Sequence, residues 1–208
     1  MMKLPRLQYI TDSVTQVERA CAAGIKWVQG RIKNKPEEET KSILVEMKNI
    51  CDKHKCIFVI NDFIELALEI KANGVHLGKN DTSIEKAKKI IKDPNFILGG
   101  TANTLEDVKK LEEHHVHYIG LGPLRFTETK VKLSPLLGFE GYKNILETRS
   151  YNSIPIFAIG GILPSDVTKL VETGVYGIAV SSYLSKSENM KNALSEFEPS
   201  LNTVTHAG

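Results

Sequence analysis

The sequence predicts an α/β fold of the TIM-barrel type, in which eight parallel strands alternate with helices and close into a single-domain (β/α)8 barrel. Three observations lead to this prediction. Eight short apolar segments recur along the 208 residues, segments with helical spacing separate them, and the first is not followed by the G-x-G-x-x-G of a dinucleotide-binding sheet. Parallel strands require such crossovers, and about 200 residues is the compact end of the range for this barrel.

The eight predicted strands are short runs, most of them bounded by glycine or polar residues, as is typical of buried strands. In chain order they are Leu7–Thr11, Trp27–Arg31, Ile57–Asn61, Gly74–Gly78, Phe96–Thr101, Tyr118–Gly122, Ile154–Gly160 and Gly177–Ser182.

The predicted helices carry recognisable signals at their ends. A proline and three glutamates open the second helix, Asn61-Asp62 is a candidate cap for the third, and T-L-E-D at the start of the fifth is close to a capping box. Gly174 is a candidate stop for the sixth. The helices are Val14–Ala23, Pro36–Lys53, Phe63–Ala72, Ser83–Lys92, Thr104–Glu113, Pro164–Thr173 and Glu188–Phe197, and the polar tail Ser200–Gly208 is expected to fray.

The composition argues against several classes of protein. A formal net charge of +2 gives no reason to expect nucleic acid or a membrane surface as a partner, and no apolar run approaches the ~20 residues that span a bilayer. Three cysteines without a C-x-x-C pair argue against a disulfide framework or a zinc site, and we interpret Cys51 and Cys56 as packing residues. The start of the chain lacks the apolar region of a secretory signal, so we expect a cytoplasmic protein. The sequence leaves the oligomeric state open, a homo-oligomer included.

The active site of such a barrel lies at the carboxyl ends of the strands, and polar residues or glycines follow most of the predicted strands. They are Gln29, Arg31 and Lys33 on the second strand, Asn61 and Asp62 on the third, Asp81 on the fourth, Thr101 on the fifth, Thr127, Thr129 and Lys130 on the sixth, Gly160 and Gly161 on the seventh, and Ser181 and Ser182 on the eighth. Because the strands are expected to be parallel, these residues should meet at one rim of the barrel.

These residue types suit two anionic groups. Glycines after the seventh strand and serines after the eighth occupy the usual phosphate site of such barrels. Asp62 and Asp81, on neighbouring strand ends, suit Mg²⁺, which takes its other ligands from water and phosphate. Arg31, Lys33 and Lys130 supply more positive charge than one monophosphate needs. We therefore expect a monophosphate near the last two strands and a Mg²⁺-bound diphosphate across strands two to six.

Less specific interpretations stay open for several residues. Asp62 and Asp81 could each cap the helix that follows. His76 lies inside a predicted strand and is expected to be a hydrogen-bonded interior residue. The H-H-V-H stretch at residues 114–117 precedes a strand, so we expect it at the opposite end of the barrel, where residues serve stability rather than metal binding.

The stretches YITD, VQGRIK, INDF, GVHLGKND, GLGPLRFTETK, AIGGI and GIAVSS, in this order and on these strand ends, resemble the thiamine phosphate synthase family. The similarity runs from about Leu7 to Leu184. It implies a transferase of thiamine biosynthesis that condenses 4-amino-2-methyl-5-hydroxymethylpyrimidine diphosphate with 4-methyl-5-hydroxyethylthiazole phosphate. The products would be thiamine phosphate and pyrophosphate.

The resemblance also implies roles for individual residues. The pyrimidine diphosphate would be held by Gln29, Arg31, Lys33, Asn61, Thr101 and Lys130, the thiazole phosphate by Thr127, Thr129, Gly161, Ser181 and Ser182, and Mg²⁺ by Asp62 and Asp81, with Arg31, Lys33 and Lys130 as the catalytic residues. The chain departs from the family at Ile32, Thr101 and Asn103, where glutamate, serine and histidine are usual.

We expect a dissociative reaction, in which the C–O bond of the diphosphate breaks early and the thiazole nitrogen then attacks the carbocation without a protein nucleophile. Two other functions stay open. One is a thiazole phosphate tautomerase of the same superfamily, which would use neither diphosphate nor Mg²⁺, and the other is a non-catalytic barrel that binds phosphorylated ligands. Asp62, Asp81 and Lys130 favour the synthase, as does Pro123, because the isomerases tend to carry histidine at that position.

Overall fold

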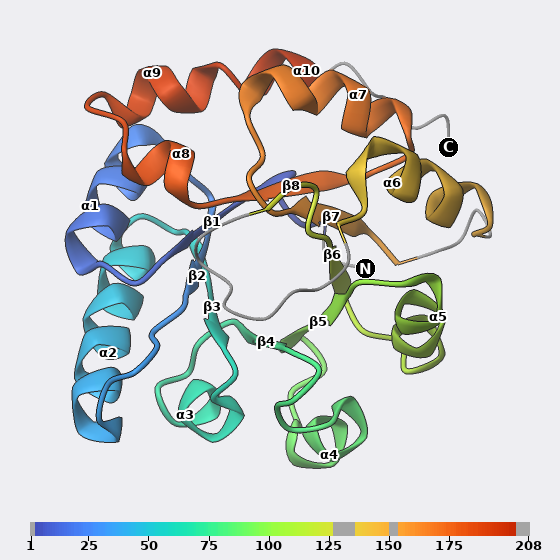
Figure 1. Cartoon of the computed structure of the whole chain (residues 1–208). Coiled ribbons are helices and arrows are strands. Elements are labelled where there is room, and N and C mark those ends of the chain that lie inside the picture. Colours follow the sequence, from blue (N-terminus) through green and yellow to red (C-terminus); the bar gives the residue numbers. More distant parts are fainter. Residues whose placement is uncertain (1–2, 127–135, 150–153, 203–208) are drawn as a thin grey trace.

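A closed ring of eight parallel strands forms the centre of the molecule, which confirms the predicted barrel (Figure 1). The computed structural model describes residues 3–126, 136–149 and 154–202. The strands are β1 (Leu7–Thr11), β2 (Trp27–Gly30), β3 (Ile57–Asn61), β4 (Gly74–Leu77), β5 (Ile97–Ala102), β6 (Tyr118–Leu121), β7 (Ile156–Ile159) and β8 (Gly177–Val180). Each strand pairs with the next, and β1 pairs with β8 through Leu7 and Ile178 to close the ring.

Helices cover the outside of this ring (Figure 1). They are α1 (Val14–Ala23), α2 (Glu37–Lys53), α3 (Ile64–Glu69), α4 (Ile84–Ile90), α5 (Leu105–Glu113), α6 (Gly138–Glu147), α7 (Val167–Glu172), α8 (Ser182–Ser185), α9 (Met190–Ser195) and α10 (Glu198–Asn202), with a 3₁₀ turn η1 (Pro164–Asp166) before α7. In the described part of the chain, every helix is too short or too polar to cross a membrane.

Several of the predicted end signals act as expected. Thr104 and Asp107 form a reciprocal capping box at the start of α5, and three glutamates occupy the first turn of α2. Gly174 follows α7 with a φ of 95°, in the left-handed region that favours glycine. The predicted cap of α3 is wrong, because that helix begins after Phe63 without any side-chain cap.

Other boundaries differ from the sequence patterns for identifiable reasons. The helix α6 was not predicted; it begins at Gly138 and contains Gly141, and glycine has a low helix propensity. The predicted helix Pro164–Thr173 divides into η1 and α7, the last predicted helix, Glu188–Phe197, shortens to α9, and α8 and α10 were not predicted. Because α10 continues to Asn202, the first three residues of the expected frayed tail are helical, and Leu201 is buried.

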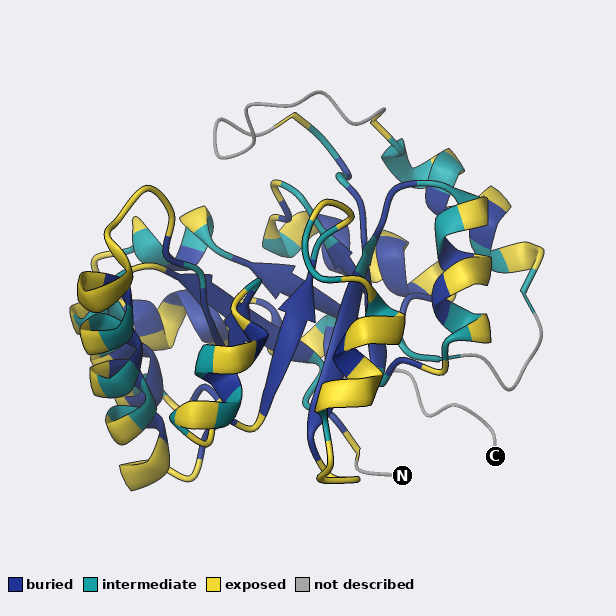
Figure 2. Ribbon diagram, turned by 90° about the horizontal axis from the view of Figure 1, so that it is seen from below, coloured by how far each residue is buried: buried dark blue, intermediate teal, exposed yellow. Residues whose placement is uncertain are grey.

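The core has two parts, one on each side of the strands, and the strands themselves are almost entirely buried (Figure 2). The larger part fills the space between the strands and the surrounding helices. The smaller part lies inside the barrel, where Trp27 packs edge-on against Tyr118 and Phe157 with ring centroids 4.8 and 4.9 Å away. Trp27 and Tyr118 are the first residues of β2 and β6, so this aromatic group fills the amino end of the barrel and leaves the carboxyl end for polar residues.

Candidate active site

The parallel barrel brings predicted site residues of six strands, β2 to β5, β7 and β8, to one end, because each of them lies at or just beyond the carboxyl end of its strand. Those in the described part of the chain are Gln29, Arg31, Lys33, Asn61, Asp62, Asp81, Thr101, Gly160, Gly161, Ser181 and Ser182. Thr127, Thr129 and Lys130 lie outside the described residues.

Two carboxyl groups meet at the ends of β3 and β4. Asp62 takes a φ of 71°, which turns the chain sharply after β3, and its N–H donates to the His76 carbonyl oxygen at 2.9 Å. The Asp81 side chain folds back over β4, where its Oδ2 accepts the Gly78 N–H at 2.7 Å. A β-carbon at Gly78 would lie 2.7 Å from this oxygen, so a glycine is needed to admit the carboxylate.

The environment of this acid pair disfavours two negative charges. Burial and the hydrogen bond to Asp81 raise the pKa of Asp62 to about 6, although the ion pair with Lys33 acts in the opposite direction. Asp62 therefore keeps its proton up to about pH 6, because the neighbouring Asp81 and burial destabilise its ionised form. The side chains of Asp62 and Asp81 do not cap the helices that follow them. The helix α3 has no side-chain cap, and α4 is capped by Ser83.

This donor set fits Mg²⁺. The ion prefers oxygen ligands, and in sites that bind phosphates it takes one or two carboxylates and leaves its other positions for water and phosphate oxygens. Asp62 and Asp81 provide two such carboxylates in contact. Lys33, just beyond the end of β2, forms an ion pair with Asp62, so a cationic side chain lies beside the candidate metal ligands.

A buried chain of hydrogen bonds crosses the barrel interior beneath the rim. Gln29 Nε2 donates to Gln8 Oε1 at 3.2 Å, and Gln8 Nε2 donates to the Tyr118 hydroxyl at 3.3 Å. His76 Nδ1 lies 3.0 Å from the same hydroxyl, and His76 Nε2 lies 2.8 Å from the Thr101 hydroxyl. Burial raises the pKa of Tyr118 well above its usual value, so its hydroxyl stays protonated. The interior position predicted for His76 is confirmed, and Gln29 and Thr101 are joined through three side chains.

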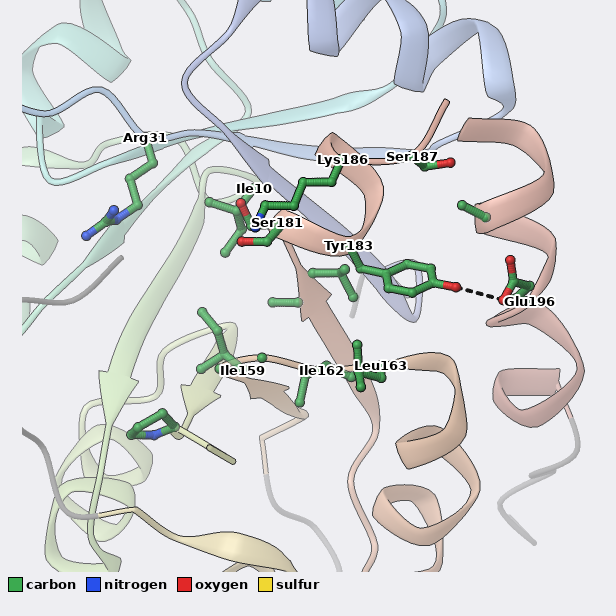
Figure 3. Close-up of a pocket in the computed structure, with 17 residues that line it drawn as sticks. Ile10, Arg31, Ile159, Ile162, Leu163, Ser181, Tyr183, Lys186, Ser187 and Glu196 are labelled. Carbon is green, nitrogen blue, oxygen red and sulfur yellow. Dashed lines mark hydrogen bonds between the residues drawn. The ribbon is translucent and has the colours of Figure 1, made fainter. Parts of the chain in front are cut away.

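A cavity of about 590 Å³ opens at the ends of β7 and β8 (Figure 3). Its lining includes Gly160, Gly161, Ser181 and Ser182 from those two strand ends, and Arg31 from β2. The volume lies in the range of small-molecule sites. The cavity therefore joins the expected phosphate residues to a cation that we expected at the diphosphate, so Arg31 stands between the two groups of residues.

The backbone at the end of β7 accepts only glycine. Gly160 has a φ of 100°, and a β-carbon there would lie 2.5 Å from Pro123 Cβ and 3.0 Å from the Leu124 nitrogen. Gly161 follows with a φ of 66°. These two positive φ values turn the chain at the cavity wall and bring it against the segment that follows β6.

Arg125, for which the sequence predicted no role, links the two segments that form this wall of the cavity. Arg125 donates two hydrogen bonds to Asp166, at 2.6 and 2.7 Å, and one to the Gly161 carbonyl oxygen at 2.5 Å. Asp166 also accepts the Leu163 N–H at 2.7 Å. Burial alone would raise the pKa of Asp166, but the Arg125 hydrogen bonds outweigh it and lower this pKa. The loops after β6 and β7 are thus held together by one buried carboxylate.

Tyr183, Lys186 and Glu196 also line the cavity, and the sequence did not predict this because their positions depend on the helices after β8. Lys186, which follows α8, extends toward Ser181, and the Tyr183 hydroxyl donates to Glu196, which follows α9, at 2.7 Å (Figure 3). Lysines and glutamates on short helices are usually solvated, so the sequence held no signal that these would line a cavity.

The remaining residues singled out in the sequence have structural positions. Ile32 is buried in the core, and Asn103, also buried, donates from its amide to the Gly122 carbonyl oxygen. In the H-H-V-H stretch, His117 Nδ1 accepts the Leu98 N–H at 3.0 Å at the amino end of the barrel. Across the described ranges, the histidines of this stretch belong to no group of three or more side chains placed to hold a metal.

The chain is similar to known proteins over most of its length. A family profile described as thiamine monophosphate synthase matches residues 5–184. The thiamine-phosphate synthase of Flavobacterium johnsoniae is 42% identical over 204 residues, which cover 94% of this chain and 96% of that protein. The thiamine-phosphate synthase of Flavobacterium psychrophilum is 42% identical over 192 residues, which cover 88% and 93%. Among solved structures, a thiamine phosphate pyrophosphorylase from Pyrococcus furiosus matches with a TM-score of 0.82 at 32% identity, over 94% of this chain and 95% of that one.

Proposed function

The chain belongs to the thiamine monophosphate synthase family, and from that premise we propose how its rim carries out the reaction. The activity is a transfer, in which a pyrimidine methylene group moves from pyrophosphate to the nitrogen of a thiazole phosphate. The observation that carries the proposed site is the contact of Lys33, Asp62 and Asp81 beside a cavity lined by Arg31, Gly161 and Ser181.

We assign the pyrimidine diphosphate to the ends of β2 to β5. Arg31 and Lys33 would neutralise the diphosphate, while Gln29, Asn61 and Thr101 would face the pyrimidine ring from the barrel interior. In support of this, Gln29 and Asn61 are buried, and the hydrogen-bonded chain fixes the orientation of Gln29 and Thr101. A preorganised polar floor of this kind orients a ring without rearranging when it binds.

We assign Mg²⁺ to Asp62 and Asp81. When bound, the ion would supply charge neutralisation for the leaving diphosphate. Below about pH 6 its binding would displace the proton of Asp62, because a carboxylate must be ionised to act as a ligand. Lys33 would then be free to turn from Asp62 to a phosphate oxygen.

We assign the thiazole phosphate to the cavity at β7 and β8. Ser181 and Ser182 offer hydroxyl donors, and Gly161 lets the backbone approach an oxyanion closely. Thr127, Thr129 and Lys130, which lie outside the described residues, are proposed on the family resemblance to complete this subsite and the diphosphate site. Arg31 lies between the two, so it would hold the substrates side by side.

In the reaction, the C–O bond between the pyrimidine methylene and the diphosphate breaks, and pyrophosphate leaves with both electrons. The amino-substituted pyrimidine carries the positive charge on the methylene. The lone pair of the thiazole nitrogen then forms the new C–N bond, which gives thiamine phosphate. The residues of the chain position the two substrates and stabilise the leaving group, and no side chain is used as a nucleophile.

The test is pyrophosphate release from purified protein with both substrates, with and without Mg²⁺. We expect release only when all three are present, and an about 10²–10³-fold lower kcat in Asp81→Asn and in Lys130→Ala. Asp93→Asn is the matched control, because Asp93 is exposed at the amino end of the barrel and should leave the rate unchanged. Isomerisation of a thiazole phosphate without Mg²⁺ would identify a tautomerase instead, and melting shifts without pyrophosphate release would identify a binding protein.

A further inference from the structure

The three cysteines of the chain, which lie 30 and 5 positions apart in sequence, converge on one point in the layer between helices α1 and α2 and the barrel strands. Cys21 is in the last turn of α1, Cys51 is in the last turn of α2, and Cys56 directly precedes β3. All three are buried free thiols, and their sulfur atoms lie within 4.8 Å of one another. The cluster adjoins the amino end of β3, whereas the candidate active site is at the carboxyl ends.

The backbone holds the three sulfurs in place through two similar helix ends. At the end of α1, Gly24 takes a φ of 105° and its N–H donates to the Cys21 carbonyl oxygen at 3.1 Å. At the end of α2, Lys55 takes a φ of 52°, and the Cys56 N–H donates back to the Cys51 carbonyl oxygen at 2.8 Å. Both are the hydrogen-bonded turns that commonly end helices. The backbone that carries the three thiols is therefore fixed by its own hydrogen bonds, without a bound ion.

The spacing of the sulfurs suits a metal ion with three sulfur ligands. At a metal–sulfur distance of about 2.3 Å, the sulfurs of a planar three-coordinate site lie about 4 Å apart. The observed limit of 4.8 Å would need a movement of less than about 1 Å. In the described part of the chain, the cluster contains only thiols, without an imidazole or carboxylate within the same reach.

The surroundings of the cluster favour one thiolate, the form that binds metals, because the hydrogen bonds with Cys21 and burial raise the pKa values of Cys51 and Cys56. Hydrogen bonds from Cys51 and Cys56 lower the pKa of Cys21. The charges of His54 and Lys26 act in the same direction, while burial opposes them. Cys21 is thus the thiol that loses its proton first, and the Lys26 charge offsets part of the negative charge of a metal–thiolate complex.

We propose that Cys21, Cys51 and Cys56 bind a single soft metal ion of the Cu(I) class through three sulfur atoms. On binding, three thiol protons leave to solvent and three metal–sulfur bonds form. Soft thiolates select soft ions, and a three-sulfur set without a fourth donor matches Cu(I) better than Zn²⁺, which is almost always four-coordinate in structural sites. The alternative is that the three cysteines only fill space in the core and bind no metal ion.

The experiment titrates the reduced, full-length protein with Cu(I) against a coloured Cu(I) chelator. We expect saturation at one ion per chain, with a thiolate-to-copper absorption band in the near ultraviolet. X-ray absorption of the loaded protein should show three sulfurs around copper, a readout that needs no variant. Because the chain has three cysteines in all, every thiolate signal comes from this cluster.

Variants provide the second readout. Cys21→Ala, Cys51→Ala and Cys56→Ala should each weaken Cu(I) binding at least about 100-fold, while Asp93→Asn, an exposed acid remote from the cluster in sequence, should bind as the parent does. Circular dichroism confirms that each variant is folded. A titration without saturation at one ion, a copper site with two sulfurs or with nitrogen, or wild-type affinity in a folded cysteine variant would overturn the proposal.

Discussion

Replacing Asp62 with asparagine is expected to stabilise the free protein above pH 6 and to remove its Mg²⁺-dependent turnover. Asparagine has nearly the shape of aspartate and tolerates the left-handed φ of 71° at this position, so the change removes a charge with little backbone strain. In the parent protein, burial and the contact with Asp81 raise the pKa of Asp62 to about 6. Above this pH, the ionised Asp62 side chain therefore lowers the stability of the folded state.

The size of the effect follows from the pKa. The folded chain holds this proton up to about pH 6, whereas the reference value for the unfolded chain is 3.8. Between these values the folded state binds more protons than the unfolded state, so the free energy of unfolding falls as the pH rises, and above pH 6 the full penalty is present. At about 1.4 kcal/mol per pH unit, the penalty is about 3 kcal/mol.

The assay is urea unfolding with a metal chelator, followed by the fluorescence of Trp27, the one tryptophan of the chain. Asp62→Asn should raise the free energy of unfolding by up to about 3 kcal/mol near pH 8 and change it little near pH 3.5. Asp52→Asn, which alters an exposed acid, is the control and should change little at either pH. If Asp62→Asn were no more stable than the parent near pH 8, the assignment of a strained acid pair would be wrong.

Three further changes test the rest of the site. Gly78→Ala should weaken the Mg²⁺ dependence of turnover by about 10–100-fold, measured by Mg²⁺ titration, because the new β-carbon would lie 2.7 Å from Asp81 Oδ2 and displace the carboxylate. Arg125→Ala should lower the free energy of unfolding by about 2 kcal/mol in urea, because it leaves the buried Asp166 carboxylate without its cation. The same change should raise KM for the thiazole phosphate, and an unchanged KM would show that the Arg125–Asp166 pair does not shape the cavity. Tyr118→Phe should cost about 1–3 kcal/mol by thermal unfolding, since two buried partners lose their hydrogen bond, and a neutral result would contradict the buried chain.

The fold could be predicted from the sequence because its signals are local and repeated. The bounds of β1, β3 and α1 match the predicted ranges, since apolar runs and helical spacing are properties of neighbouring residues. The helix α6 escaped prediction because its two glycines weaken the local helical signal, and packing against the barrel supplies the stability instead.

The candidate site could be predicted where strand order alone brings residues together. Asp62 and Asp81 follow neighbouring parallel strands, so their contact follows from the topology. The pair of Arg125 and Asp166 joins residues 41 positions apart on two loops, and no local pattern marks such a pair. The role of Gln8 was missed for a similar reason, because an amide inside β1 gives no sign of which interior side chain it meets.

The buried chain from Gln29 to Thr101 also bears on how this barrel could acquire a different specificity. Its five members come from β1, β2, β4, β5 and β6, and each has its orientation set by its neighbour. A substrate ring with a rearranged pattern of donors and acceptors could not be matched by turning one side chain, because that turn would break a bond elsewhere in the interior. New ring chemistry would require coordinated substitutions on several strands at once.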